Sequence, residues 1–251
     1  MKVVDCKWEL ANLGCRVAEI TVQDFSDFDE TQIREAEETF DYIVIKTGTK
    51  DFPLYEKISQ MGYQFAEAQL SVMKNIRKLD VSSDKLVQYH LRHFRFEQIS
   101  SDSQFEDCLS NMTTGMYKTD RIYLDPQFGP EYSLRRYRNW SVTEYQKGSP
   151  CFQMIYQNKC AGLAVLNLEG EVVHGLLAGF FEHYQKIGLG IMIPAIPLIY
   201  KDTNYWLYKT NISSNNQPVI EMYIHHGYSL DNIQYVFIKH INKAGRFLNV
   251  E

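Results

Sequence analysis

The chain has 251 residues, of which 45% are hydrophobic and 14% aromatic, enough to bury the core of one large domain or two modest ones. The formal net charge of -5 argues against a protein whose main partner is nucleic acid or an anionic membrane, because both favour clustered Lys and Arg. The five Cys are scattered and lack Cys-x-x-Cys spacing, and charged residues interrupt the N-terminus. We therefore expect a cytoplasmic protein with reduced thiols, no metal site and no membrane segment.

Apolar periodicity and turn residues predict the first elements in chain order. They are strands over residues 16–22, 41–47 and 63–73, and helices over residues 30–40 and 52–61. The charged segment 75–85 has the composition of a linker, so we expect an N-terminal module over 1–74 and a second domain over 86–251. A helix, a Gly-Tyr pair and a long strand occur in both parts, at Gly62 and Gly227. The first module could thus be a reduced copy of the second.

The second part predicts a mixed sheet with several hairpins. The expected strands cover 90–99, 151–157, 160–167, 172–181, 205–210 and 229–240, and the expected helices cover 105–116, 132–145 and 218–226. Short turns between the strands from 151 to 181 indicate antiparallel pairing. A further helix should follow residue 190, but Pro194 and Pro197 predict that it is kinked or shortened, since each removes an amide donor.

A glycine turn between a strand and a helix is the most informative motif of the chain. It consists of Gln185, Lys186, Ile187, Gly188, Leu189 and Gly190. The first amides of a helix lack internal partners and lie at the positive end of its dipole, and glycine lets the backbone approach a ligand closely. The turn therefore predicts an anion site that suits a diphosphate.

The turn resembles the diphosphate loop of the GNAT superfamily of acetyl-CoA-dependent N-acetyltransferases. The segment from Thr210 to Asn216, followed by Tyr223 and Gly227-Tyr228, and the closing strand around Tyr235 resemble that family too. The resemblance covers residues 86–242. It implies an α+β fold with a mixed, largely antiparallel sheet flanked by helices, preceded here by a smaller N-terminal α/β partial module. It also implies acetyl-CoA as co-substrate and a small-molecule amine as acceptor.

A narrower resemblance is to the TDP-fucosamine acetyltransferase type, which acetylates aminosugars carried on a nucleotide diphosphate. It rests on Lys7-Trp8-Glu9, on Leu13-Gly14 and on the stretch from Asp120 to Asp125 that leads to Tyr137 and Trp140. It implies that Arg121, Tyr137 and Trp140 bind the acceptor. Arg135, Arg136 and Arg138 could grip a phosphate or could equally form a solvated helix face.

The GNAT resemblance also implies how the donor is held. The loop from Gln185 to Gly190 would bind the diphosphate, while backbone amides of Ala178, Gly179 and Phe180 would lie beside the thioester. Gly179 could mark a bulge in its strand or be an ordinary buried residue. Asn215 and Asn216 would cap the following helix, and they could also bond the pantetheine arm.

Tyr223 is the predicted general acid, because its phenol could return a proton to the departing thiolate. A core aromatic is the alternative role. Glu182 is the candidate base, with His183, His225, His226 or a water as alternatives. Three functions remain open on the sequence: acetylation of a small amine, acetylation of a protein amine, and acyl-CoA sensing without turnover. The oligomeric state, monomer or homodimer, is also open.

Overall fold

The computed structural model describes residues 1–81 and 84–241. It is a mixed α/β protein whose hydrogen-bonded strand order is β1-β2-β3-β10-β4-β9-β8-β7-β6-β5, largely antiparallel and flanked by helices. The chain divides into two compact units. Among the described residues, unit 1 comprises 1–70, 213–215 and 233–241, and unit 2 comprises 71–81, 84–212 and 216–232. No helix in the described part of the chain is long and apolar enough to cross a membrane.

Unit 1 begins with an antiparallel pair and continues with a parallel one. Its elements are β1 (Lys2–Asp5), α1 (Glu9–Leu13), β2 (Val17–Val22), η1 (Phe25–Asp27), α2 (Glu30–Thr39), β3 (Tyr42–Thr47), α3 (Phe52–Gln60) and the first part of β4 (Gln64–Asn75). Strand β2 pairs parallel with β3, and β3 pairs antiparallel with the end of β10 (Ser229–His240). The predicted strands and helices of this region are confirmed, with small changes at their ends.

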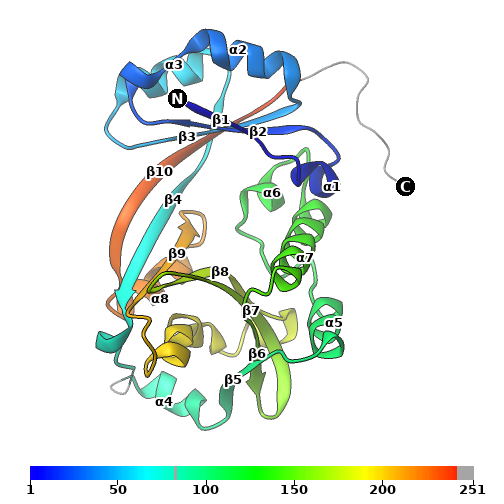
Figure 1. Cartoon of the computed structure of the whole chain (residues 1–251), viewed down its shortest axis with the longest axis vertical. Helices are drawn as coiled ribbons and strands as arrows, with labels where there is room; N and C mark the ends of the chain where they lie inside the picture. The colour runs from blue at the N-terminus through cyan, green and yellow to red at the C-terminus, as the bar shows by residue number, and fades with distance from the viewer. Residues whose placement is uncertain (82–83, 242–251) are drawn as a thin grey trace. The chain divides into compact units, whose positions relative to one another are not determined.

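Local capping and one apolar face explain the two longer helices of unit 1. The Asp29 carboxylate accepts the Gln32 amide at the start of α2, and Asp51 does the same for Leu54 in α3. Both helices lie on one side of strands β1 to β3 (Figure 1) and bury residues such as Ile33 against the strands. Helix α3 ends before Gly62, whose φ of 87° suits glycine.

Unit 2 contains the hairpins and the glycine turn. Its elements are η2 (Ile76–Lys78), α4 (Lys85–Leu91), β5 (Phe94–Gln98), α5 (Asp102–Ser110), α6 (Arg121–Leu124), α7 (Pro130–Gln146), β6 (Cys151–Tyr156), β7 (Lys159–Glu169), β8 (Val172–Phe180), η3 (Glu182–Tyr184), η4 (Leu189–Tyr200), β9 (Leu207–Ser213), α8 (Gln217–His225) and the start of β10. Strands β5 to β8 pair antiparallel in sequence order, as the short turns predict.

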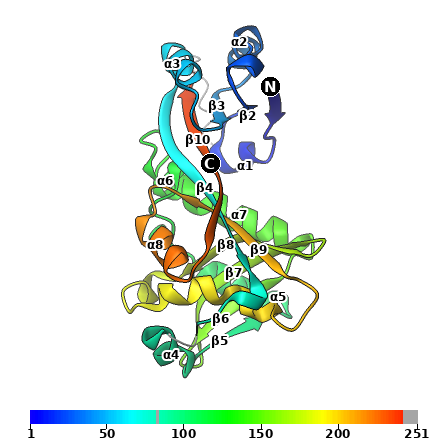
Figure 2. The same cartoon turned by 90° about the vertical axis from the view of Figure 1, so that its left-hand side faces the viewer.

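The central strand β7 is apolar on both faces because both faces are covered. Alternate residues of a strand point to opposite sides. Leu163 and Val165 pack with residues of α5, whereas Ala164 and Leu166 pack with residues of η4 and α8. The sheet of this unit thus separates two apolar clusters, and Figure 2 shows η4, in yellow, running between α4 and α8 on one of its sides.

Two expectations for the elements of unit 2 need correction. The strand expected over 90–99 begins only at Phe94, because His90 belongs to α4, whose first turn Asp84 caps. The helix expected over 105–116 spans Asp102–Ser110 instead. The segment after the glycine turn is a 3-10 helix, consistent with the two prolines inside it. In the segment expected to be a linker, Ile76, Leu79 and Val81 are buried in the core of unit 2.

Candidate functional site

Strands β8 and β9 separate halfway along β8. Their parallel pairing runs from Val172 opposite Leu207 to Gly175 opposite Thr210, and β8 then continues to Phe180 paired with β7 alone within the described residues. The Thr210 hydroxyl donates to the Gly175 carbonyl at 2.9 Å, at the last paired position. Beyond this point the β9-facing edge of β8 has backbone groups that can bind an extended ligand.

A bulge lies next to the point of separation. Val165 of β7 pairs with Leu177, whereas Leu166 pairs with Gly175, so Leu176 is the extra residue of β8. The bulge considered for Gly179 is therefore placed wrongly by three residues. Gly179 is paired regularly with Leu163, and a Cβ at Gly179 would lie 3.2 Å from the Tyr117 ring. Its lack of a side chain lets Tyr117 pack on the strand.

The glycine loop follows β8 and leads into η4, as the sequence predicts. Gly188 has a φ of 80° and precedes the first residue of η4, Leu189, which is fully buried. The residues from Gln185 to Gly188 are exposed. The turn before η4 is therefore the exposed part of the motif, and its backbone amides are the groups that an anion could reach.

Two residues assigned to this site also hold a neighbouring loop. The Gln185 side-chain amide donates to the carbonyls of Gly115 and Phe180 at 3.0 and 3.2 Å. The Glu182 carboxylate accepts the Thr113 hydroxyl at 3.1 Å and lies 4.0 Å from the Lys118 ammonium. Both contacts attach the segment after α5 to the end of β8, so Gln185 shapes the loop with its side chain and could bind a ligand only through its backbone.

His90 lies behind the glycine loop and was missed by the sequence reasoning. Its side chain is 2% exposed, and neither ring nitrogen has a hydrogen-bond partner in the described part of the chain. A Cβ at Gly188 would lie 3.5 Å from its Nε2 atom. Burial lowers the pKa of His90, so the ring is neutral at pH 7.

Tyr223 belongs to a cluster of three buried tyrosines. The ring of Tyr223 meets Tyr228 edge-on at 4.7 Å, and Tyr228 meets Tyr208 at 6.0 Å. Tyr223 and Tyr208 share a side-chain hydrogen bond, whereas the Tyr228 hydroxyl donates to the Pro194 carbonyl at 2.6 Å. Burial raises the pKa of Tyr208 to about 12, and burial together with its two tyrosine neighbours raises the pKa of Tyr223 well above its ordinary value.

Tyr208 connects this cluster to the separation of the strands. A Cβ at Gly175 would overlap the Tyr208 hydroxyl, so glycine is required where β8 leaves β9. No local sequence signal marks Tyr208, because it is one aromatic residue in an ordinary strand pattern. The structure thus brings Gly175, Tyr208 and Tyr223 together, of which only Tyr223 was predicted.

The remaining candidates around α8 have other partners. Asn216 stands at the N-cap of α8, but its side chain makes no capping hydrogen bond, so the capping expectation is wrong for it. Asn215 is exposed. His225 Nε2 lies 2.6 Å from an Asp84 carboxylate oxygen, and His226 Nδ1 lies 2.8 Å from the Met222 carbonyl. Neither histidine is positioned by these contacts as a base beside Tyr223.

The residues expected to bind the acceptor fall into two groups. Tyr137 stacks on Tyr117 with 3.8 Å between ring centroids, and Arg138 donates to the Met112 carbonyl at 2.5 Å, so both hold the segment after α5. Arg121 begins the short helix α6, which Asp120 caps. Trp140 differs, because it lines a pocket.

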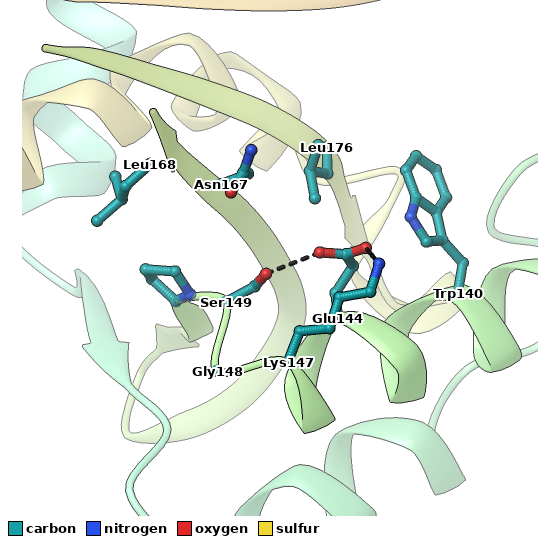
Figure 3. A pocket seen from close by; sticks show the side chains of 9 residues that line it. Trp140, Glu144, Lys147, Gly148, Ser149, Asn167, Leu168 and Leu176 are labelled. Carbon is teal, nitrogen blue, oxygen red and sulfur yellow. Dashed lines mark hydrogen bonds and ion pairs between the residues drawn. The ribbon is translucent and has the colours of Figure 1, made fainter. Parts of the chain in front are cut away.

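The pocket lies between the end of α7 and strands β7 and β8, and its volume is about 440 Å³. Figure 3 shows the Glu144 carboxylate between Ser149 and Lys147, with Trp140 and Leu176 above it. The residues that line the pocket are Trp140, Glu144, Lys147, Gly148, Ser149, Pro150, Asn167, Leu168 and Leu176. Leu176 is the bulge residue, so the pocket adjoins the place where β8 leaves β9. In the described residues no cluster of His, Cys, Asp or Glu is arranged to hold a metal ion.

Comparisons with known proteins support the fold and no closer relationship. No family model matches the chain, and no curated protein matches it. A conserved protein of unknown function from Staphylococcus epidermidis superposes with a TM-score of 0.59 at 13% identity, covering 90% of this chain and 84% of its own. A GCN5-related N-acetyltransferase from Kribbella flavida gives 0.55 at 13% identity, with 89% and 81% covered.

A third structure is a tandem GNAT protein from the clavulanic acid biosynthesis pathway. It superposes with a TM-score of 0.51 at 11% identity, covering 92% of this chain and 79% of its own. These identities are too low to carry an activity or a substrate from one protein to another. Together with the separated strands and the glycine loop, they show that this chain has the GNAT fold, the fold of GCN5-related N-acetyltransferases.

Proposed function

We propose that the protein is an N-acetyltransferase that moves the acetyl group of acetyl-CoA to the primary amine of a small acceptor. One observation carries the proposal: β8 leaves β9 after Gly175 and ends in an exposed glycine loop before η4. Acetyl-CoA has an extended amide-containing arm and a diphosphate. The edge of β8 offers hydrogen bonds to the arm, and the amides from Lys186 to Gly190 offer them to the diphosphate.

The chemistry needs a polarised thioester carbonyl. The backbone amide of Ala178 or of Gly179 is our candidate, because the β9-facing edge of β8 is unpaired from Leu176 on within the described residues. Successive amides of a strand point to opposite edges, so one of the two faces this edge. Amides held by a sheet do not have to reorganise when negative charge develops on the carbonyl oxygen. In this proposal Phe180 contributes through its backbone, since its side chain is buried under η4.

Tyr223 is our candidate for the general acid that protonates the departing thiolate. Its raised pKa keeps the phenol protonated at neutral pH, and Tyr208 would orient it through their hydrogen bond. Glu182 is our candidate for the base that accepts the ammonium proton, since its side chain is 57% exposed at the end of β8. The amine then attacks the carbonyl carbon, the carbon–sulfur bond breaks, and CoA leaves as the thiol.

An acyl-CoA sensor without turnover is the second candidate. Tyr223 is only 3% exposed, which fits a core aromatic as well as an acid. A thiol-release assay with acetyl-CoA distinguishes the two. The acceptor panel contains a linear diamine, a free aminosugar, a nucleotide-linked aminosugar and a lysine peptide; the third is included because residues 120–140 resemble the TDP-fucosamine type.

The proposal predicts thiol release above the amine-free rate with at least one small amine. Binding of CoA without release by any amine would favour the sensor. Release with the peptide alone would contradict a small acceptor. Release with the nucleotide-linked aminosugar alone would support the narrower resemblance.

A further inference from the structure

The pocket beside Leu176 has the size of a small-molecule site. Its volume of about 440 Å³ lies within the range of roughly 300–1,000 Å³ typical of ligand pockets. Its lining is mainly polar, with Asn167 and Glu144 among the polar residues, and Leu168 and Leu176 add apolar surface. This combination gives a small ligand both contact area and orientation.

A fixed carboxylate is the main charged group of the pocket. Glu144 is 9% exposed, and its carboxylate accepts hydrogen bonds from the Ser149 hydroxyl at 2.7 Å and from the Lys147 ammonium at 2.8 Å. Burial alone would raise the pKa of Glu144, but the hydrogen bonds from Lys147 and Ser149 outweigh it and lower the pKa. The group is therefore a carboxylate at neutral pH, held in one orientation from two sides.

The countercharge of this carboxylate is exposed and replaceable. The Lys147 ammonium lies 2.8 Å from Glu144 Oε1, but the Lys147 side chain is 62% exposed. A long exposed lysine side chain loses entropy when it is fixed, and an exposed ion pair contributes little to stability. An ammonium group on a ligand could take the place of Lys147, while Ser149 keeps the carboxylate oriented.

The same lining is poorly suited to an anion. Phosphate sites use rigid Arg forks or several backbone amides, whereas the one cation that lines this pocket among the described residues is the exposed, paired Lys147. An anionic ligand would also face the fixed Glu144 carboxylate. The indole of Trp140 beside the carboxylate suits a cation or the methylene chain that carries it.

We infer that this pocket binds a cationic amine with more than one ammonium group, such as a linear diamine, and that Glu144 holds one ammonium in place of Lys147. The inference rests on the proposed function in one respect: it makes the pocket the acceptor site, with the second amine directed towards the bulge of β8. The acceptor class is then a polyamine-like molecule and not a nucleotide-linked sugar.

Calorimetric titration with putrescine, without acetyl-CoA, tests the inference. Substitutions of Glu144 and of Lys147 should change the affinity for putrescine in opposite directions. Glu144→Gln should weaken binding by about tenfold or more, because a hydrogen bond to a charged group is lost. Lys147→Ala should tighten binding several-fold, because the competing ammonium is gone. Lys159→Ala and Glu169→Gln, both exposed on β7, serve as matched controls and should leave the affinity unchanged.

Weaker binding by Lys147→Ala, or unchanged binding by Glu144→Gln, would overturn the inference, and Lys147→Ala remains decisive if Glu144→Gln folds poorly. Tighter binding of a nucleotide-linked aminosugar than of putrescine would overturn it as well. If putrescine binds with the expected pattern but no thiol is released, the pocket is an amine site and the proposed acetyl transfer is wrong. If thiol is released with putrescine and neither Glu144→Gln nor Lys147→Ala changes its KM, acetyl transfer is supported and the assignment of the pocket as the acceptor site is wrong.

Discussion

The Tyr223 hydroxyl is the group whose role can be tested most simply at the scale of one residue. If it protonates the leaving thiolate, Tyr223→Phe should lower kcat by roughly 10²–10⁴-fold while leaving CoA affinity nearly unchanged. It should also lower the free energy of unfolding by about 1 kcal/mol, because the Tyr208 hydroxyl loses its partner. Steady-state kinetics and urea unfolding measure the two effects.

Tyr228→Phe provides the matched control for this substitution. Its hydroxyl bonds the Pro194 carbonyl in the same cluster, so its loss should reduce stability by a similar amount and leave kcat within a few-fold of the wild type. If both variants change kcat equally, Tyr223 is a structural residue of the core and not the general acid.

His90 predicts a pH dependence of stability. Burial lowers the pKa of His90 in the folded protein, so the folded state resists a proton that the unfolded state accepts below about pH 6.5. The free energy of unfolding should therefore fall as the pH drops from about 6.5 towards the lower folded-state pKa of His90. Above about pH 6.5 this group should have no effect on stability. His90→Leu should flatten the difference in Tm between pH 7.5 and 5.5, and exposed His183→Gln should not. An unchanged slope in His90→Leu would contradict the neutral, unpartnered state of the ring.

At the scale of elements, the separation of β8 and β9 depends on Gly175. A Cβ there would overlap the Tyr208 hydroxyl, so Gly175→Ala should displace Tyr208 or spread the two strands. We expect a loss of roughly 1–3 kcal/mol in the free energy of unfolding and a parallel loss of activity. Gly170→Ala is the control for glycine replacement in the same hairpin, because a Cβ there meets no atom within 4 Å, although its φ of 58° makes some strain unavoidable. Activity retained in Gly175→Ala would separate this point of the sheet from the site.

Most elements could be predicted because their signals are local. The strand from Ser229 to His240 has the predicted bounds, and Pro194 and Pro197 indicated the irregular η4. Helix α4 was not predicted, because seven residues with two buried positions, Val87 and His90, make only a weak periodic pattern. The bounds of α5 were the least reliable, because no glycine or proline marks its end at Ser110.

The site was less predictable because its geometry depends on pairing between distant segments. The loop from Gln185 to Gly190 is contiguous and could be recognised, whereas the bulge at Leu176 depends on the register of β8 against β7. Tyr208 and Gly175 meet only because two strands 30 or so residues apart pair in parallel. Resemblance to a family found Tyr223, and no local pattern indicated its partner.

At the scale of the whole molecule, one order of elements occurs twice along the chain. Strands β2 and β3 pair in parallel and are followed by α3, Gly62-Tyr63 and the 12-residue strand β4. Strands β8 and β9 pair in parallel and are followed by α8, Gly227-Tyr228 and the 12-residue strand β10. That the N-terminal region is a reduced copy stays a prediction, with which this repetition is consistent.

The two stretches differ at the position of the glycine loop. Between β2 and β3 the chain contains no glycine, and the start of α2 is occupied by Asp29 and Glu30. These carboxylates would repel a diphosphate from that helix start. We therefore predict one CoA per chain, measured as the stoichiometry of a calorimetric titration; two equivalent sites would contradict the assignment of donor binding to unit 2.

A crystal structure with acetyl-CoA would show directly where the donor binds. We predict that the diphosphate lies on the backbone amides from Lys186 to Gly190 and that the pantetheine arm follows the unpaired edge of β8, with the thioester between Leu176 and Gly179. Acetyl-CoA bound away from the glycine loop, or bound there with its arm directed away from β8, would contradict this prediction.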